Sequence, residues 1–289
     1  MTATELNFGQ VKPLILAFKD RFLDVSKPVV MGILNVAPDS FFDGGKYNSE
    51  KETITQTEKM LSEGAAIIDI GAVSTRPGAK EISEKGEWQR LQPVLKTLIN
   101  QFPEAIFSVD TYRSYIAEIA IQEGAKMVND ISGGTFDSRM PETIAKLKVP
   151  FVLMHIKGTP QNMQVDPHYD NVVEEVKKFF ELQLKKFKEI GVSENIILDP
   201  GFGFGKTVEH NYRLLRELKV FGDLGFPVMA GLSRKSMINK LLKIKPVEAL
   251  NGTTILNTVA LLNGANVLRV HDVKEAIQAI ELVQFYKKT

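Results

Sequence analysis

Short apolar runs alternate with longer amphipathic segments along most of the chain. The segments between runs have helical spacing; from Val173 to Phe187 the apolar residues recur every three or four positions, with lysines on the opposite face. Eight buried strands, each followed by a helix, predict an α/β fold in which a parallel sheet closes into a (β/α)8 TIM barrel. A doubly wound open sheet is the alternative. The apolar runs span 29–34, 66–70, 106–109, 126–129, 151–154, 196–198, 228–230 and 267–269.

The length of 289 residues fits a single domain of this class. The predicted barrel occupies residues 29–289, and no repeat or Pro/Gly/Ser-rich linker divides it. Residues 1–28 precede the first strand, and we expect this extension to cap the bottom of the barrel or to run along its side.

Composition excludes several classes of protein. Lys and Arg number 36 against 35 Asp and Glu, so no global field attracts nucleic acid or an anionic membrane. The absence of cysteine excludes disulfides, thiolate metal sites and a thiol nucleophile. The N-terminus lacks the pattern of a signal peptide, and no apolar segment approaches the roughly 20 residues that span a bilayer. We therefore expect a cytoplasmic protein whose partners are small molecules.

Unusual polar residues follow the carboxyl ends of the apolar runs, where barrel enzymes place their active sites. Asp110, Asn129 and Asp199 offer carboxylate and amide acceptors to a ring rich in N–H groups, and Lys235 complements a ring carbonyl. This set fits the aminopyrimidinone edge of a pterin or of guanine. Taken singly, each of these residues also fits a helix cap or a surface turn.

Other segments after the runs favour an aromatic ligand with an anionic tail. Segment 199–206 (DPGFGFGK) combines three glycines, two phenylalanines and a lysine; it matches neither the Walker nor the dinucleotide pattern and suits a flat aromatic ligand. Arg76 lies in a Pro-Gly turn with two hydroxyls, and Arg269 and His271 lie on one side of an extended segment. The loop 35–45, with its glycines and adjacent phenylalanines, predicts a lid.

Eight segments in this order resemble the dihydropteroate synthase family: MGILNVAPDSFFDGG, STRPGA, SVDTYRS, VNDISGG, LMHIKGTPQNMQ, ILDPGFGFGKTVEHN, GLSRKSMI and RVHDV. They span residues 31–273, essentially the whole predicted barrel. The resemblance implies a homodimeric barrel. It also implies that the chain condenses 6-hydroxymethyl-7,8-dihydropterin diphosphate with p-aminobenzoate and releases pyrophosphate. We expect this displacement to be largely dissociative and assisted by Mg²⁺.

The resemblance also implies roles for individual residues. The pterin pocket would have a hydrogen-bonding wall of Asp110, Asn129, Asp199 and Lys235 and an apolar lining of Met154 and Phe204. The diphosphate site would comprise Asn35, Arg269 and His271, with Asn35 also reaching Mg²⁺. Two closing loops would contribute Asp39 and Arg76, and the p-aminobenzoate slot would be framed by Phe41, Thr75, Pro77 and Ser236. The residues implied to act in catalysis are Asn35, Asp39, Arg76, Lys235, Arg269 and His271.

The chain departs from the family pattern in two loops. Ala37 stands where Thr is common, and Ala72-Val73 stand where Gly-Glu is frequent. Both departures concern how the closing loops meet rather than an assigned ligand contact. Two other functions share the pterin pocket: a methyltransferase barrel acting on methyltetrahydrofolate with a corrinoid partner, and a non-catalytic pterin-binding barrel. The methyltransferase has no evident use for the segment 233–236 or for a diphosphate cluster.

Overall fold

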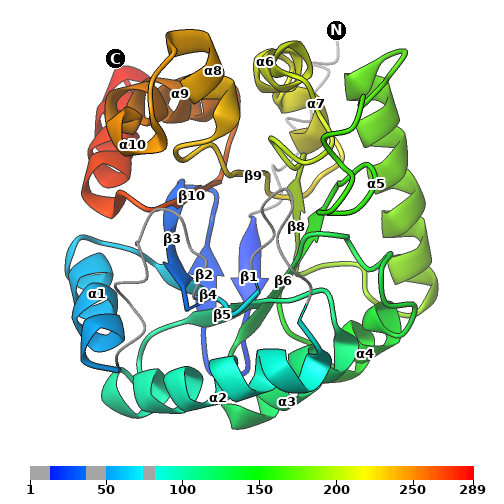
Figure 1. Cartoon of the computed structure of the whole chain (residues 1–289), viewed down its shortest axis with the longest axis vertical. Helices are drawn as coiled ribbons and strands as arrows, with labels where there is room; N and C mark the ends of the chain where they lie inside the picture. The colour runs from blue at the N-terminus through cyan, green and yellow to red at the C-terminus, as the bar shows by residue number, and fades with distance from the viewer. Residues whose placement is uncertain (1–13, 37–49, 74–81) are drawn as a thin grey trace, which may run out of the picture.

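Eight parallel strands hydrogen-bond side by side in the order β8-β7-β6-β5-β4-β3-β10-β9. A parallel bridge between Leu198 and Val228 joins the two ends of this order, so the sheet closes on itself. The computed structural model describes residues 14–36, 50–73 and 82–289, and Figure 1 shows its helices surrounding the strands. The barrel strands are β3 (Val29–Asn35), β4 (Ile67–Gly71), β5 (Phe107–Asp110), β6 (Met127–Asp130), β7 (Phe151–Met154), β8 (Ile196–Asp199), β9 (Met229–Ala230) and β10 (Val267–Val270).

Each barrel strand leads into at least one helix before the next strand begins. The predicted (β/α)8 barrel is therefore confirmed, and the alternative of an open sheet is wrong. Every predicted run agrees with its strand to within one residue at each end. The helices are α1 (Glu50–Ser62), α2 (Glu84–Gln101), α3 (Ser114–Glu123), α4 (Met140–Leu147), α5 (Val172–Glu189), α6 (Val208–Arg216), α7 (Lys219–Gly222), α8 (Ser236–Leu242), the 3-10 helix η2 (Pro246–Glu248), α9 (Leu250–Leu262) and α10 (Val273–Tyr286).

The helices cover the outside of the barrel and bury a large apolar layer against it. Helix α5 illustrates how the sequence builds this layer. Its start is fixed by the Asn171 side chain, which accepts hydrogen bonds from the backbone N–H groups of Val173 and Glu174 at 3.2 and 3.4 Å. Phe180 and Phe187 of the same helix are fully buried in the layer. No helix in the described part of the chain is long and apolar enough to cross a membrane.

The inside of the barrel is closed at the amino-terminal end of its strands by an apolar cluster that we call the bottom layer. Side chains alternate between the two faces of a strand, so one position in two points inward. The bottom layer contains one such residue from each strand or from the position just before it: Met31, Ile67, Ile106, Met127, Val152, Ile197, Met229 and Val267.

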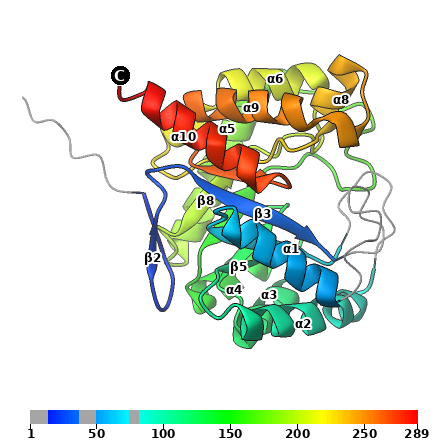
Figure 2. The same ribbon diagram turned by 90° about the vertical axis from the view of Figure 1, so that its left-hand side faces the viewer.

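A short antiparallel hairpin of β1 (Ile15–Ala17) and β2 (Phe22–Asp24) packs under the bottom layer through residues such as Leu16. Figure 2 shows this hairpin at the end of the barrel opposite to the tip of the β3 arrow. Asn195 accepts a hydrogen bond from the Ala17 backbone N–H at 2.7 Å and donates one to the Ala17 carbonyl at 2.9 Å. The amide of Asn266 donates to the Val25 carbonyl at 3.0 Å. A division of the chain into an extension and a barrel at residue 28 stays a prediction.

Candidate active site at the carboxyl end of the barrel

Two residues beyond the bottom layer, the inward positions of several strands change from apolar to polar. Each of these residues shares its strand face with a member of the bottom layer, because side chains two positions apart point the same way. We call this set the polar layer: Asp69, Ser108, Asn129, Asp199 and Arg269. Asp69, Ser108, Asn129 and Asp199 are buried, and the set lies toward the carboxyl ends of the strands, which form the mouth of the barrel.

A network of hydrogen bonds joins side chains from four strands at the mouth. The Arg269 guanidinium donates from Nε to Asp69 Oδ2 at 2.7 Å and from Nη2 to Asp110 Oδ2 at 2.8 Å. The Asn129 amide donates to the same Asp69 oxygen at 2.8 Å. Strands β4, β5, β6 and β10 thus contribute to one cluster, although their residues span two hundred positions of the sequence.

Burial changes the titration of Asp110 within this cluster. Desolvation raises the pKa of its carboxyl from 3.8 to about 7, the Arg269 charge opposes the rise, and the neighbouring Asp69 charge adds to it. The protonated form of the Asp110 carboxyl is therefore favoured relative to a carboxyl in water. A carboxyl in this state can accept hydrogen bonds from a ligand when ionised and donate one when protonated.

Asp199 and Lys235 form a second charged pair on the other side of the mouth. A methyl carbon placed on Gly231 would lie 3.9 Å from Lys235 Nζ and 4.0 Å from Asp199 Oδ2, so both groups converge there. Burial raises the pKa of Asp199, with Lys235 opposing the change. Burial lowers the pKa of Lys235 to about 8, against the opposing charge of Asp199. The Lys235 ammonium donates to the Phe202 carbonyl and lies 4.6 Å from the centre of the Phe204 ring.

The glycine-rich loop after β8 is held by Lys206. The buried Lys206 ammonium donates to the carbonyls of Gly201 and Phe204 at 3.0 Å and lies 3.0 Å from His155 Nδ1. Gly201 has φ of +69°, and a Cβ there would lie 2.0 Å from the His155 carbonyl oxygen. Lys206 therefore organises the loop from inside. Met154, buried at the end of β7, is the register partner of Asp199.

Asn35 and His271 complete the described part of the mouth. A methyl carbon on Gly71 would lie 3.6 Å from Asn35 Oδ1 and 3.6 Å from Asp110 Oδ2, so these two oxygens face the same space. His271 Nδ1 lies 2.9 Å from the hydroxyl of Ser233, in the loop after β9. Ser236 is exposed at the first residue of α8.

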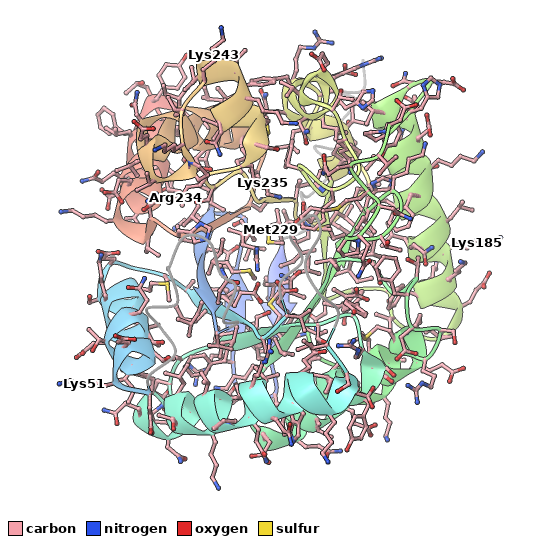
Figure 3. The ribbon with its side chains drawn as sticks, in the orientation of Figure 1. Lys51, Lys185, Met229, Arg234, Lys235 and Lys243 are labelled. Atoms are coloured by element: carbon pink, nitrogen blue, oxygen red, sulfur yellow. The ribbon has the colours of Figure 1, made fainter. Side chains whose placement is uncertain are left out.

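An ion pair locks together the two loops that carry Lys235 and His271. Arg234, with φ of +55°, donates from Nε and Nη2 to the two carboxylate oxygens of Asp272 at 3.0 and 2.6 Å. Asp272 is the N-cap residue of α10, yet its side chain makes no capping hydrogen bond. The Asp272 side chain therefore pairs with Arg234 and does not cap the helix. Figure 3 shows Met229 and Lys235 toward the middle of the ring of helices, whereas Lys51 and Lys185 extend outward.

The structure brings Asp110, Asn129, Asp199, Lys235 and Arg269 to one mouth, as the sequence led us to expect. The functional roles assigned to them stay predictions. The predicted residues Asp39, Phe41, Thr75, Arg76 and Pro77 lie outside the described residues.

Asp69 was missed by the sequence analysis. The available signal was a charged residue in the middle of the apolar run 66–70, where an acidic side chain requires a buried partner. Because the run itself was used only to place a strand, the carboxylate within it was overlooked.

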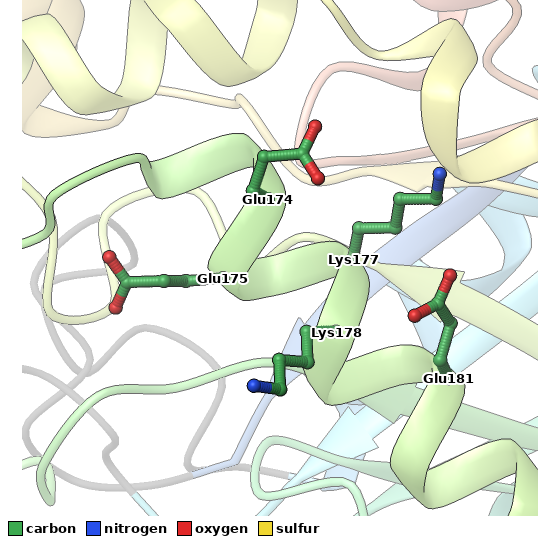
Figure 4. A pocket seen from close by; sticks show the side chains of 5 residues that line it. All are labelled: Glu174, Glu175, Lys177, Lys178 and Glu181. Atoms are coloured by element: carbon green, nitrogen blue, oxygen red, sulfur yellow. The ribbon is translucent and has the colours of Figure 1, made fainter.

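A separate hollow of about 340 Å³ lies on the outer surface of α5 (Figure 4). Its lining consists of acidic and basic side chains of this single helix: Glu174, Glu175, Lys177, Lys178 and Glu181. Because these charges of both signs come from one exposed helix face, the hollow lacks the convergence of separate elements that marks the barrel mouth. It carries no functional assignment.

Comparison with known proteins agrees with this geometry. Residues 31–271 match the family described as pterin binding enzyme. The chain is 43% identical over 263 residues to the dihydropteroate synthase of Escherichia coli, covering 91% of this chain and 93% of the relative. The Yersinia pestis dihydropteroate synthase in a sulfonamide complex superposes with a TM-score of 0.92 at 39% identity, covering 96% of this chain and all (100%) of that one. The Xanthomonas albilineans dihydropteroate synthase with 4-aminobenzoic acid has a TM-score of 0.88 at 36% identity, covering 96% and 99%.

Proposed function

Because this chain belongs to the dihydropteroate synthases, transferases of folate biosynthesis within the pterin-binding enzymes, we propose how its described residues divide the work of the reaction. The observation that carries the proposal is the convergence of three carboxylates, an amide and two cations at one barrel mouth. In this proposal the substrates are 6-hydroxymethyl-7,8-dihydropterin diphosphate and p-aminobenzoate.

The pterin ring occupies the pocket bounded by Asp110, Asn129, Asp199 and Lys235. The carboxylates accept the N–H groups of the ring, since a buried carboxylate can take two parallel hydrogen bonds. The Lys235 ammonium donates to the ring carbonyl. Support comes from the burial of Asp199 beside Lys235, which keeps both charges close to where a planar ring would lie. Phe204 and Met154 form the apolar lining.

The diphosphate lies toward Arg269, His271 and Asn35. As the bond between the pterin methylene carbon and the diphosphate oxygen breaks, its electron pair leaves with pyrophosphate. The Arg269 charge stabilises that negative charge as it develops. The arylamine nitrogen forms the new bond to the electron-poor carbon and then loses its proton to water or pyrophosphate. The displacement is largely dissociative, and no general base from the chain is required.

Magnesium fits this site through Asn35. The described residues contain no group of three acidic or histidine side chains able to hold a metal ion by themselves. Mg²⁺ usually keeps several waters and binds substrate phosphates, so it needs few protein ligands, and the amide oxygen of Asn35 would supply one of them. When bound, the ion would neutralise charge on the diphosphate oxygens.

The p-aminobenzoate ring lies near Lys235 and the start of α8, with its carboxylate next to the exposed Ser236 hydroxyl. The loops outside the described residues complete this slot. In the proposal Phe41, Thr75 and Pro77 frame the ring, while Asp39 and Arg76 act from the two closing loops.

A homodimer is part of the proposal. Large apolar side chains of α8, α9 and α10 remain exposed on this chain, and exposed apolar surface is what an interface between chains covers. Figure 2 shows α8, α9 and α10 close together along one side of the molecule. Within these three helices the most exposed of these side chains are Leu241, Ile255, Leu282, Phe285 and Tyr286. A second copy of the chain would cover them. The cytoplasmic location expected from the sequence stays a prediction.

Pyrophosphate release tests the proposed division of work. Purified protein is incubated with the pterin diphosphate, p-aminobenzoate and Mg²⁺, and the reaction is repeated without each component. Release that requires the arylamine and Mg²⁺ supports the proposal. A methyltransferase would release no pyrophosphate, and a non-catalytic barrel would bind the pterin without turnover. Release that proceeds equally without Mg²⁺ would remove the metal from the mechanism.

A further inference from the structure

Asp69 is a buried carboxylate of the polar layer that hydrogen-bonds to two residues of the proposed site. It lies in the middle of β4, and its side chain is 0% exposed. A single oxygen, Oδ2, accepts from Arg269 Nε at 2.7 Å and from Asn129 Nδ2 at 2.8 Å. The Arg269 Nη2 atom lies 2.7 Å from the same oxygen. Asp69 therefore links the diphosphate side of the site to the pterin side.

The contacts of Asp69 fix the orientation of the Arg269 guanidinium. This group is planar, with its donors in a rigid fork. Its Nε edge is held by Asp69, and Nη2 is shared between Asp69 and Asp110. Nη1 hydrogen-bonds to no residue within 14–36, 50–73 or 82–289. With two nitrogens held by carboxylates, the remaining one is available to an anionic ligand.

The position of Asp69 is costly for stability alone. A buried ion pair generally stabilises a fold no better than well-packed apolar residues of similar volume. The second oxygen, Oδ1, is also buried and has no hydrogen-bond partner among the described residues. The adjacent inward residues of β4, Ile67 and Gly71, carry no charge. A carboxylate in this strand thus requires an explanation beyond packing.

We infer that Asp69 is a positioning residue that orients Arg269 toward the leaving diphosphate and, through the same oxygen, holds Asn129 in the pterin wall. This inference rests on the proposed function of the site. Asp69 acts through these two side chains and does not contact substrate. The competing explanation is that Asp69 only neutralises buried charge inside the barrel.

A double-mutant cycle with Asp69→Asn and Arg269→Ala separates the two explanations, because residues that act through one another have non-additive effects. We expect Asp69→Asn to lower kcat by about 100-fold, the upper range for a residue that orients a ligand-contacting group. The KM for p-aminobenzoate should change far less. In the Arg269→Ala background, Asp69→Asn should lower kcat by no more than about threefold. Equal losses in both backgrounds would overturn the inference.

Asp130→Asn is the matched control. Asp130 is also 0% exposed and accepts three hydrogen bonds, but all come from Ser132 and Gly134 of its own turn. Its replacement should have the same effect on kcat in both backgrounds, whatever the size of that effect.

A second measurement decides the question independently of turnover. Binding of inorganic pyrophosphate in the presence of Mg²⁺ is measured by calorimetry for the same four proteins. We expect Asp69→Asn to weaken binding by about tenfold, and by much less when Arg269 is already Ala. If the wild-type protein binds pyrophosphate but does not release it from the pterin diphosphate in a reaction that requires the arylamine, the proposed function is wrong. The binding measurements would still test whether Asp69 positions Arg269.

Arg269→Lys keeps the buried charge balance and covers the case in which Asp69→Asn does not fold. A lysine ammonium is a point charge and lacks the fork that Asp69 orients. If orientation matters, Arg269→Lys should lose nearly as much turnover as Arg269→Ala. Turnover within about threefold of wild type would show that charge alone suffices and would overturn the inference.

Discussion

The two halves of the barrel interior are built from the same strands, but the side chains of one half are apolar and those of the other are largely polar or charged. Ile67, Met127 and Ile197 belong to the bottom layer, sealed by the hairpin and free of charge. Two residues further along the same strands, Asp69, Asn129 and Asp199 replace them with buried polar groups. A shift of about 7 Å along a strand therefore separates a layer that stabilises the fold from one that serves chemistry.

This separation has an electrostatic basis. The mouth gathers three carboxylates, Asp69, Asp110 and Asp199, against two cations, Arg269 and Lys235. Burial of such groups disfavours their charged forms unless partners compensate. The pKa of Asp110 rises and that of Lys235 falls accordingly. The bottom layer stabilises the barrel interior, so the mouth can keep buried polar groups that contribute little to the stability of the fold.

The largest effect on kcat should come from replacing an arginine at the mouth. Replacement of an arginine at the closed end of the barrel is the control. We expect Arg269→Ala to lower kcat by about a thousandfold, the upper range for losing one donor to transition-state charge. Pterin affinity should fall much less. Arg21, in the turn of the hairpin, also pairs with two carboxylates, Asp20 and Glu104, each at 2.9 Å. Arg21→Ala should leave kcat unchanged. Steady-state kinetics of both variants checks this, and an unchanged kcat with raised KM for Arg269→Ala would contradict its role in leaving-group stabilisation.

A bottom-layer deletion should show the reverse pattern. Ile197 is fully buried, and Ile197→Ala should lower the free energy of unfolding by about 3 kcal/mol through lost burial and a residual cavity. Its kcat should stay within about twofold of wild type, although Asp199 lies two residues away. Urea unfolding and initial rates measure the two quantities. A large fall in kcat in a folded variant would mean that the two layers are mechanically coupled.

The fold could be predicted because each strand is encoded by a local pattern in the sequence. Strands of a closed parallel barrel are buried on both faces, so each appears as a short continuous apolar run. The strands from Val29 to Val270 were therefore placed to within one residue. The convergence at the mouth followed from the rule that the carboxyl ends of such strands meet.

Partnerships between distant residues were not predictable from the same patterns. Asp69 and Arg269 meet across the β10-β3-β4 part of the sheet, and no local spacing encodes that contact. The loop residues Arg234 and Lys206 both carry charges near the mouth, yet the first is paired to Asp272 and the second is buried among carbonyls. Sequence identifies a charge near the mouth but cannot say whether it faces a ligand or the protein.

The pH dependence of turnover should distinguish the mouth from the bottom layer, whose members do not titrate. Lys235, with a pKa lowered to about 8, should lose its proton as pH rises through 8, and kcat/KM should then fall by up to about tenfold per pH unit. Lys235→Arg should remove this basic limb, because a guanidinium stays charged. The same rise in pH should increase stability while it lowers kcat/KM. Between pH 8 and 10.5 Lys235 binds more protons in the unfolded state than in the folded state, so this residue makes the free energy of unfolding rise across that window.

The smallest effect concerns the polar contacts that attach the hairpin to the barrel. Asn195 adopts φ of +62° and exchanges two hydrogen bonds with the Ala17 backbone. Asn195→Gly keeps that backbone conformation accessible and removes only the side chain, so it should lower the free energy of unfolding by about 1–2 kcal/mol. Asn195→Asp retains the acceptor for the Ala17 N–H but places a carboxylate oxygen against the Ala17 carbonyl, so it should be no more stable than Asn195→Gly. Both variants should keep wild-type kcat, measured beside thermal unfolding, because the hairpin supports the bottom layer alone. A loss of turnover without a loss of stability would show that the closed end of the barrel contributes to the chemistry at the open one.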